Sequence, residues 1–238
     1  MLAYQDSLGK IKHSRETAQQ VAELAKKYDL NELPANVAGM TAIRDGFHGY
    51  AESARQRAAG LLSMSDERLA RANAALALAQ NGDTAQAEKR INDLNREFSD
   101  DVRIKYSYSP AVQALNLLHR NKPAEAIALL EAPGKYEMGF PIFNTTYLLT
   151  YVRGLAYSQA HDGNKAAAEF RKILDHRGLN TISVFLPLAQ LQLARAYALQ
   201  GDTTKARTAC QDFFAIWKDA DPDVPVLIAA KSEDAKLK

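Results

Sequence analysis

The sequence contains Tyr151-Val152-Arg153-Gly154-Leu155-Ala156-Tyr157 and, 40 residues later, its counterpart Leu191-Gln192-Leu193-Ala194-Arg195-Ala196-Tyr197. Each stretch has a small residue at its fourth position and a tyrosine at its seventh. After a polar turn, each is followed by another small residue, Ala166 or Ala206, with apolar residues four and seven positions later. This arrangement predicts two antiparallel helices whose small side chains let the backbones approach, while aromatic rings fill the space between neighbouring helix pairs.

The same spacing extends through most of the chain. Six times, a small residue follows a turn-forming residue by five positions. The small residues, spaced by 40, 33, 39, 40 and 40 positions, are Ser14, Ala54, Ala87, Ala126, Ala166 and Ala206. The turn-forming residues are Gly9, Gly49, Gly82, Asn121, His161 and Gly201. Self-similarity at this period predicts an all-α fold, a right-handed superhelical solenoid of about five to six antiparallel helix hairpins.

In its order of small, aromatic and apolar positions, the chain resembles the tetratricopeptide repeat (TPR). It departs from that motif in two ways, because the tryptophan of the first helix is absent and the usual period of about 34 is lengthened to about 40. In the unit marked by Ala42 and Ala54, Asp45 also occupies the place that is usual for an aromatic residue. Longer helices or longer loops between repeats would absorb the extra residues.

The coarse pattern predicts helices and almost no strands, the β-rich run 181–185 being a loop or a helix entry. The expected helices are 4–28, 34–47, 51–62, 66–80, 84–98, 104–120, 123–131, 143–160, 164–175, 184–200, 202–218 and 224–236. We expect the helix over 224–236 to cap the last repeat, with Trp217, Val226 and Leu227 as its apolar contacts. Because Gly9 lies at the turn of the first hairpin, we expect 1–238 to be one solenoid domain, a fragment of a longer protein with its first hairpin truncated.

Composition argues against two classes of partner. The formal net charge is +2, and there is no cluster of Lys and Arg such as a phosphate backbone requires, so we expect no nucleic-acid contact. No run approaches 18 consecutive apolar residues, so we expect no membrane insertion by this chain. The single cysteine, Cys210, stands where Phe170 stands in the preceding repeat, and is expected to be a small buried hydrophobic residue.

The sequence shows no catalytic, cofactor or metal motif. The five histidines are scattered, without the paired spacing of a zinc site. Asp219, Asp221 and Asp223 alternate like the start of a calcium loop, but Ala230 stands where the loop requires a glutamate. The run Asp175-His176-Arg177 is explained by a helix C-terminus, which favours basic side chains. We therefore expect a non-enzymatic chain with no cofactor and no bound metal.

Three phrases resemble one group of repeat domains more closely. They are Tyr151 to Tyr157, Ile173-Leu174-Asp175-His176-Arg177-Gly178, and Trp217-Lys218-Asp219-Ala220-Asp221-Pro222-Asp223-Val224-Pro225. They resemble the C-terminal tetratricopeptide domain of acidobacterial signalling proteins, which carry an N-terminal serine/threonine kinase or winged-helix DNA-binding domain. The resemblance implies that this chain is the docking or sensor part of such a protein. The sequence itself contains none of the kinase motifs. It implies a periplasmic location if the parent protein is membrane-anchored, and a cytoplasmic one otherwise.

In a stack of hairpins the first helices line a concave face. The repeat register predicts an aliphatic floor there, with five polar or amphipathic anchors: Gln80, His119, Tyr151, Gln159 and Arg195. We expect this face to hold a peptide or partner segment, although contact of these residues with water or a neighbouring hairpin explains them equally well. One alternative is a small-ligand sensor with a pocket under the loop 132–144, which contains Tyr136, Phe140 and Phe143. Another is self-association into a homo-oligomer through a terminal repeat.

Overall fold

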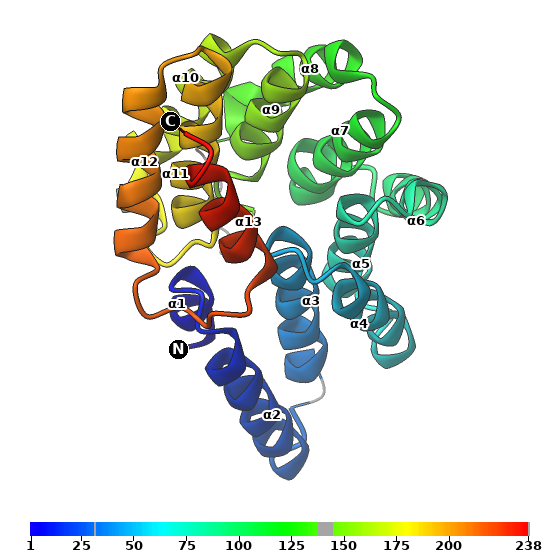
Figure 1. Cartoon of the computed structure of the whole chain (residues 1–238). Helices are drawn as coiled ribbons and strands as arrows, with labels where there is room; N and C mark the ends of the chain where they lie inside the picture. Colours follow the sequence, from blue (N-terminus) through cyan, green and yellow to red (C-terminus); the bar gives the residue numbers. More distant parts are fainter. Residues whose placement is uncertain (31, 138–144, 238) are drawn as a thin grey trace.

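The computed structural model describes residues 1–30, 32–137 and 145–237, and every regular element in these ranges is a helix (Figure 1). The α-helices are α1 (Leu2–Ser7), α2 (Ile11–Lys27), α3 (Glu32–Phe47), α4 (Ala51–Met64), α5 (Arg68–Gln80), α6 (Thr84–Glu97), α7 (Ser109–His119), α8 (Pro123–Glu131), α9 (Leu148–Gln159), α10 (Gly163–Asp175), α11 (Phe185–Leu199), α12 (Thr203–Ile216) and α13 (Pro225–Asp234). A π-helical turn, η1 (Ile104–Tyr108), leads into α7, and the 3-10 turns η2 (Pro133–Tyr136) and η3 (Arg177–Leu179) follow α8 and α10.

The all-helical prediction is confirmed, and most of the expected helix ends lie close to those observed. The run 181–185 is indeed a loop that enters α11 at Phe185. The helix expected over 4–28 is wrong in one respect, because the chain breaks at Gly9 into α1 and α2.

Every hairpin turns at a residue with left-handed backbone geometry. The six residues, with φ between 57° and 90°, are Gly9, Gly49, Gly82, Asn121, His161 and Gly201. The next residue donates its amide to the carbonyl five positions earlier, as Asp83 does to Leu78 at 3.0 Å. This is the Schellman closure, which satisfies a carbonyl that the helix end would otherwise leave without a partner. The turn residues predicted from the sequence therefore share one geometry.

The small residues that follow these turns share one environment. All six are fully buried, at 0% exposure: Ser14, Ala54, Ala87, Ala126, Ala166 and Ala206. Each is the fourth residue of the second helix of its hairpin, and its amide bonds to the carbonyl of the residue before that helix, as Ala87 does to Asp83 at 3.0 Å. The prediction that these positions are packing contacts is confirmed.

Helices pack in chain order, so the hairpins follow one another along a curved path (Figure 1). Each helix contacts the next, and the first helices of successive hairpins also touch, α3 with α5, α5 with α7, α7 with α9 and α9 with α11. One cluster of buried apolar residues runs through these hairpins from Ala35 to Ala196. The C-terminal ends of α5, α7 and α9 are thereby brought together on one side of the core.

Gly154 of α9 shows how close two of these helices come. A Cβ atom placed on it would lie 2.6 Å from the ring of Phe170 in α10, well inside the contact distance of real side chains. Phe170 is itself fully buried, so its ring has no free space to move into. Glycine is needed here because of the ring of Phe170.

Gly154→Ala is therefore expected to lower the free energy of unfolding by about 1–3 kcal/mol through overpacking. Urea unfolding monitored by circular dichroism measures this change. The matched control is Gly60→Ala in α4, where a Cβ meets nothing within 4 Å, and where higher helix propensity should add up to about 1 kcal/mol. Equal stability of the two variants would contradict the packing argument.

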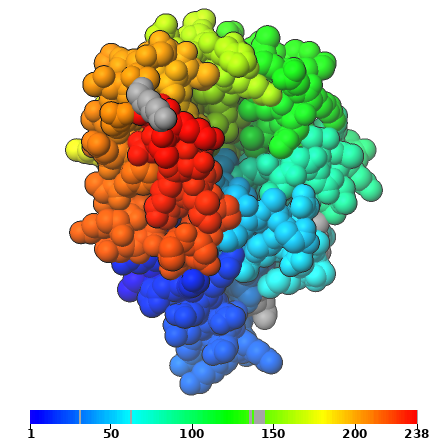
Figure 2. All heavy atoms as spheres, in the orientation of Figure 1, coloured from blue at the N-terminus to red at the C-terminus, as the bar shows by residue number. Residues whose placement is uncertain are grey.

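The two ends of the described chain meet. The indole Nε1 of Trp217 donates to the carbonyl of Ser7 at 3.0 Å, and the Asp221 amide donates to the carbonyl of Gly9 at 3.0 Å. Figure 2 shows the N-terminal segment in blue lying against the C-terminal segment in orange. A second apolar cluster joins the two ends: Ile11, Leu191, Phe213, Trp217, Val224, Leu227 and Ala230.

The C-terminal helix packs on α12 and buries Trp217 and Leu227, in agreement with the predicted cap. The same segment also reaches the turn between α3 and α4, where the Val226 amide donates to the His48 carbonyl at 3.2 Å. The cap therefore closes the stack of hairpins on itself, a contact that the repeat pattern did not indicate.

Candidate functional site

A cleft of about 380 Å³ lies where α5, α7 and α9 end, beside α3 and α11. Four of the five predicted anchors line it: Gln80, His119, Tyr151 and Gln159. Gln192 of α11 joins them, although the repeat register did not select it, and Leu115 and Leu155 form part of the apolar floor. No Asp, Glu, Lys or Arg is among the described residues that line the cleft.

Two of these anchors link successive hairpins. The Nε2 atom of His119 lies 3.2 Å from the carbonyl of Gln80 and donates to it, and the Gln159 amide donates to the carbonyl of Leu118 at 3.0 Å. Both carbonyls belong to helix C-termini, where backbone acceptors need side-chain or solvent partners. The contact with a neighbouring hairpin therefore accounts for one hydrogen bond of each side chain. Both side chains also line the cleft.

Gln80 differs from these two. Its side chain packs over Gly46, where a Cβ would lie 2.6 Å from the amide oxygen of Gln80. Both polar atoms of the Gln80 amide are buried, and neither has a hydrogen-bond partner in the described part of the chain. A buried amide without partners is destabilising, so Gln80 offers unsatisfied hydrogen-bonding capacity at the cleft.

Tyr151 forms the floor of the cleft rather than an exposed anchor. It is 3% exposed and packs edge-on against Phe47, with ring centroids 5.5 Å apart. Its ring is tilted against that of Phe185, with centroids 5.0 Å apart. Burial raises the pKa of Tyr151 to about 12, so the phenol is neutral at physiological pH. Its hydroxyl accepts from the Gln192 amide at 3.4 Å. This aromatic group brings α3 against α9 and α11.

Arg195 does not line the cleft. Its guanidinium makes two hydrogen bonds to the Glu233 carboxylate of α13, at 2.7 and 2.8 Å. The C-terminal helix, expected as a cap of the last repeat, thus binds the side chain that was expected to anchor a partner.

The loop proposed to close a small-ligand pocket lies largely outside the described residues. Phe140 and Phe143 belong to the undescribed part, as does the side chain of Tyr136. Ion pairs hold the first part of the loop. The buried Arg153 guanidinium pairs with Glu137 at 2.8 Å, and Lys172 also pairs with Glu137. The described residues therefore place the start of the loop against α9 and α10.

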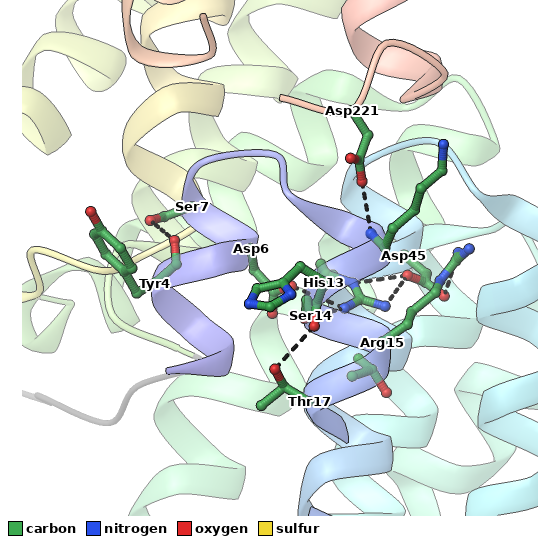
Figure 3. Close-up of polar contacts among 12 residues, drawn as sticks. Tyr4, Asp6, Ser7, His13, Ser14, Arg15, Thr17, Asp45 and Asp221 are labelled. Atoms are coloured by element: carbon green, nitrogen blue, oxygen red, sulfur yellow. Dashed lines mark hydrogen bonds and ion pairs between the residues drawn. The ribbon is translucent and has the colours of Figure 1, made fainter. Parts of the chain in front are cut away.

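A second polar cluster is buried between α1, α2 and α3 (Figure 3). The Arg44 guanidinium donates to Asp6 at 2.9 Å, to Asp45 at 2.8 Å and to the Ser14 hydroxyl at 2.8 Å. Asp45 also pairs with Arg57 at 2.9 Å. Arg44 is 1% exposed and Asp45 0%. The acidic residue in an aromatic position, noted in the sequence, is therefore the centre of an ion cluster that ties α1 to α3.

Burial and charge act in opposite directions on the two carboxyl groups. Burial raises the pKa of Asp6 above its usual value, and the opposing effect of Arg44 is smaller. For Asp45 burial also favours the neutral form, but Arg44, Ser53 and Arg57 together outweigh it, so the pKa is lowered. Hydrogen bonds within the cluster make it a structural device that fixes α1 against α3.

His48 adjoins this cluster and packs on Trp217, with ring centroids 5.3 Å apart. It is fully buried, and neither ring nitrogen has a hydrogen-bond partner in the described chain. Burial, aided by the charge of Arg44, lowers the pKa of His48 to about 3. The ring is neutral in the folded state and would accept a proton readily only after unfolding.

Stability contributed by a neutral His48 is complete above the unfolded pKa of about 6.5 and is lost as the pH falls towards 3. Between pH 6.5 and pH 5, we expect His48 to reduce the free energy of unfolding by about 2 kcal/mol. Urea unfolding at each pH measures the slope. His48→Phe should flatten it, whereas His13→Phe, at an exposed position of α2, should retain it. The raised pKa of Asp6 gives the free energy of unfolding an opposite pH dependence, but this contribution is the same in all three proteins and cancels when they are compared. The same slope in the wild type and in His48→Phe would refute the assignment to His48.

The alternating aspartates and the single cysteine noted in the sequence have structural explanations. The Asp221 carboxylate accepts from the Lys12 amide at 2.7 Å, and Asp223 pairs with the Lys12 ammonium at 3.3 Å, so both hold the two chain ends together. Burial raises the pKa of the Cys210 thiol to about 11, which keeps it protonated at neutral pH. Within the described ranges, no three His, Cys, Asp or Glu residues are grouped so as to hold a metal ion.

No protein-family model matches this chain, and no curated protein matches it either. Among the helices of residues 1–30, 32–137 and 145–237, none combines the length and the apolarity needed to cross a bilayer.

Proposed function

We propose that this chain is a non-catalytic interaction module, a TPR-like right-handed solenoid that holds an uncharged, extended segment of a partner protein in the cleft around Gln80. The observation that carries the proposal is the convergence of side chains from α5, α7, α9 and α11 on one cleft. Its floor is apolar, and its described lining residues include no Asp, Glu, Lys or Arg.

The cleft residues match the chemistry of a peptide backbone. A glutamine amide presents one acceptor and two donors, which complement the carbonyl and the N–H of a peptide unit. The Gln80 amide, whose two polar atoms are buried without a partner in the described chain, would gain such bonds on turning from Gly46 into the cleft. Leu115 and Leu155 offer contact to an apolar side chain. A charged side chain would lose hydration here without meeting an opposite charge, so neutral segments are favoured.

The regular hairpins support the same role. A stack of hairpins that are built alike presents equivalent helix ends at successive positions, and such surfaces hold extended ligands in repeat proteins. We extend the proposal to a bacterial signalling protein as the parent of this module, on the sequence resemblance alone. An affinity on the order of micromolar is expected for a single site of this size.

A small-ligand sensor is the second candidate. A volume of about 380 Å³ falls within the range of small-molecule sites, and the same neutral amides would bind an uncharged polar compound. Binding of a compound without any bound peptide would favour this alternative.

The docking proposal is tested with a displayed library of random peptides. We expect the selected peptides to lack charge at their central positions. Leu155→Trp, whose larger side chain fills the cleft, should lower the affinity for these peptides at least tenfold. The matched control is Arg171→Trp, which places the same ring at an exposed position of α10. Circular dichroism establishes that both variants are folded.

Gln159→Lys, which introduces charge at an exposed residue of the cleft, is a second variant and should also weaken binding. Peptides that bind Leu155→Trp and Arg171→Trp equally well, or that carry central charges, would contradict the proposal.

A further inference from the structure

A second cavity, of about 290 Å³, lies where α1 meets the last two hairpins. Its walls are mainly aliphatic and come from segments distant in sequence: Leu8, Leu174, Leu186, Pro187 and Ile216. Tyr4 and Ile216 are 53% and 40% exposed. No lining residue is shared with the cleft around Gln80, so the two sites are independent.

Three side chains with hydrogen-bond donors at this cavity are exposed to solvent and bond to no other described residue. They are the Arg177 guanidinium and the hydroxyls of Tyr4 and Thr181, and Figure 3 shows Tyr4 directed away from the buried ion cluster. The other polar side chains of the lining are already engaged. Ser7 donates to the Tyr4 carbonyl at 2.8 Å, and Ser183 accepts from the Phe185 amide at 3.2 Å. The Gln190 amide donates to Asp212 at 3.2 Å.

We infer that this cavity binds a small apolar carboxylate, with the hydrocarbon part against the aliphatic walls and the carboxylate on Arg177. A guanidinium offers two parallel N–H donors that match the two oxygens of a carboxylate. Among the described residues of the lining, Arg177 is the one cation, and it makes no ion pair with any described residue. The hydroxyls of Tyr4 and Thr181 supply further donors for the same group.

The size of the cavity limits the ligand. A volume of about 290 Å³ lies at the lower edge of small-molecule sites, which fits a single medium-length acyl chain or one aromatic ring. A ligand of this kind would also cover the exposed rings and chains of Tyr4 and Ile216, removing apolar surface from water. The combination of an aliphatic wall and one free cation selects an acid over an alcohol or an amine of the same length.

The chain contains its own reporter for this site. Trp217 is the single tryptophan of the sequence, and its indole donates to the carbonyl of Ser7, a residue that lines the cavity. Octanoate, kept below its micelle concentration, is the probe, and its binding is followed by tryptophan fluorescence and by isothermal titration calorimetry. Octanol and octylamine have the same chain without the carboxylate.

We expect saturable octanoate binding in the millimolar range or tighter, and at least tenfold weaker binding of octanol and octylamine. Arg177→Gln should lower the affinity for octanoate at least tenfold and leave the affinity for octanol unchanged. The control Arg171→Gln removes an exposed arginine of α10 that does not line the cavity, and should bind octanoate as the wild type does. Tyr4→Phe should weaken octanoate by a smaller factor.

Absence of saturable octanoate binding would overturn the inference, as would equal affinity of the Arg177→Gln and Arg171→Gln variants. Equal affinity for octanoate and octylamine would do the same, since it would show that the cavity selects only hydrocarbon. Because Leu155→Trp leaves this cavity unaltered, its octanoate binding should be normal whether or not peptides bind the cleft.

Discussion

The packing of each hairpin depends on a small side chain at the fourth residue of its second helix. Ala87 and Ala166 illustrate this position, where the side chain is fully buried and its size limits how closely two helices approach. The left-handed residue five positions earlier fixes where the second helix starts relative to the first. Because turn and contact are repeated together, successive hairpins present the same helix ends side by side. The cleft around Gln80 is a consequence of that repetition.

At the N-terminal end, charge replaces some of the apolar packing. Arg44 binds Asp6 and also Asp45, which stands where the later units have leucine or tyrosine, and all three side chains are buried. A buried ion cluster adds little net stability over apolar residues of equal volume, but it tolerates few other geometries, since any lost partner leaves a buried charge. We propose that its role is to fix α1 in the one position from which the Trp217 segment closes the stack.

The polar groups of this molecule fall into two sets. In the cluster around Arg44, the carboxylates and the guanidinium satisfy one another, so little capacity remains for a ligand. Gln80 and Arg177, in contrast, lie at cavities. The Gln80 amide is buried without a partner among the described residues, whereas the Arg177 side chain is exposed and makes no ion pair with a described residue. Buried or half-enclosed polar groups without partners are uncommon in folded chains. We propose Gln80 and Arg177, rather than the most charged cluster, as the side chains that contact ligands.

The sequence by itself determined the elements and their local geometry. The turn residues, the buried small residues and most helix ends depend on contacts within about ten positions, which a repeating pattern records directly. The register also placed Gln80, His119 and Gln159 on one face, because equivalent positions of adjacent hairpins are neighbours in space.

Only the tertiary structure decided which hairpins that are distant in sequence contact one another. The bond of Trp217 to Ser7 and the contact of Phe47 with Tyr151 join positions that no nearest-neighbour pattern relates. They depend on the summed curvature of all the intervening hairpins, to which every helix contact makes a small contribution. For this reason Tyr151 became the floor of the cleft, and the cavity beside Arg177 exists because α1 meets the last two hairpins.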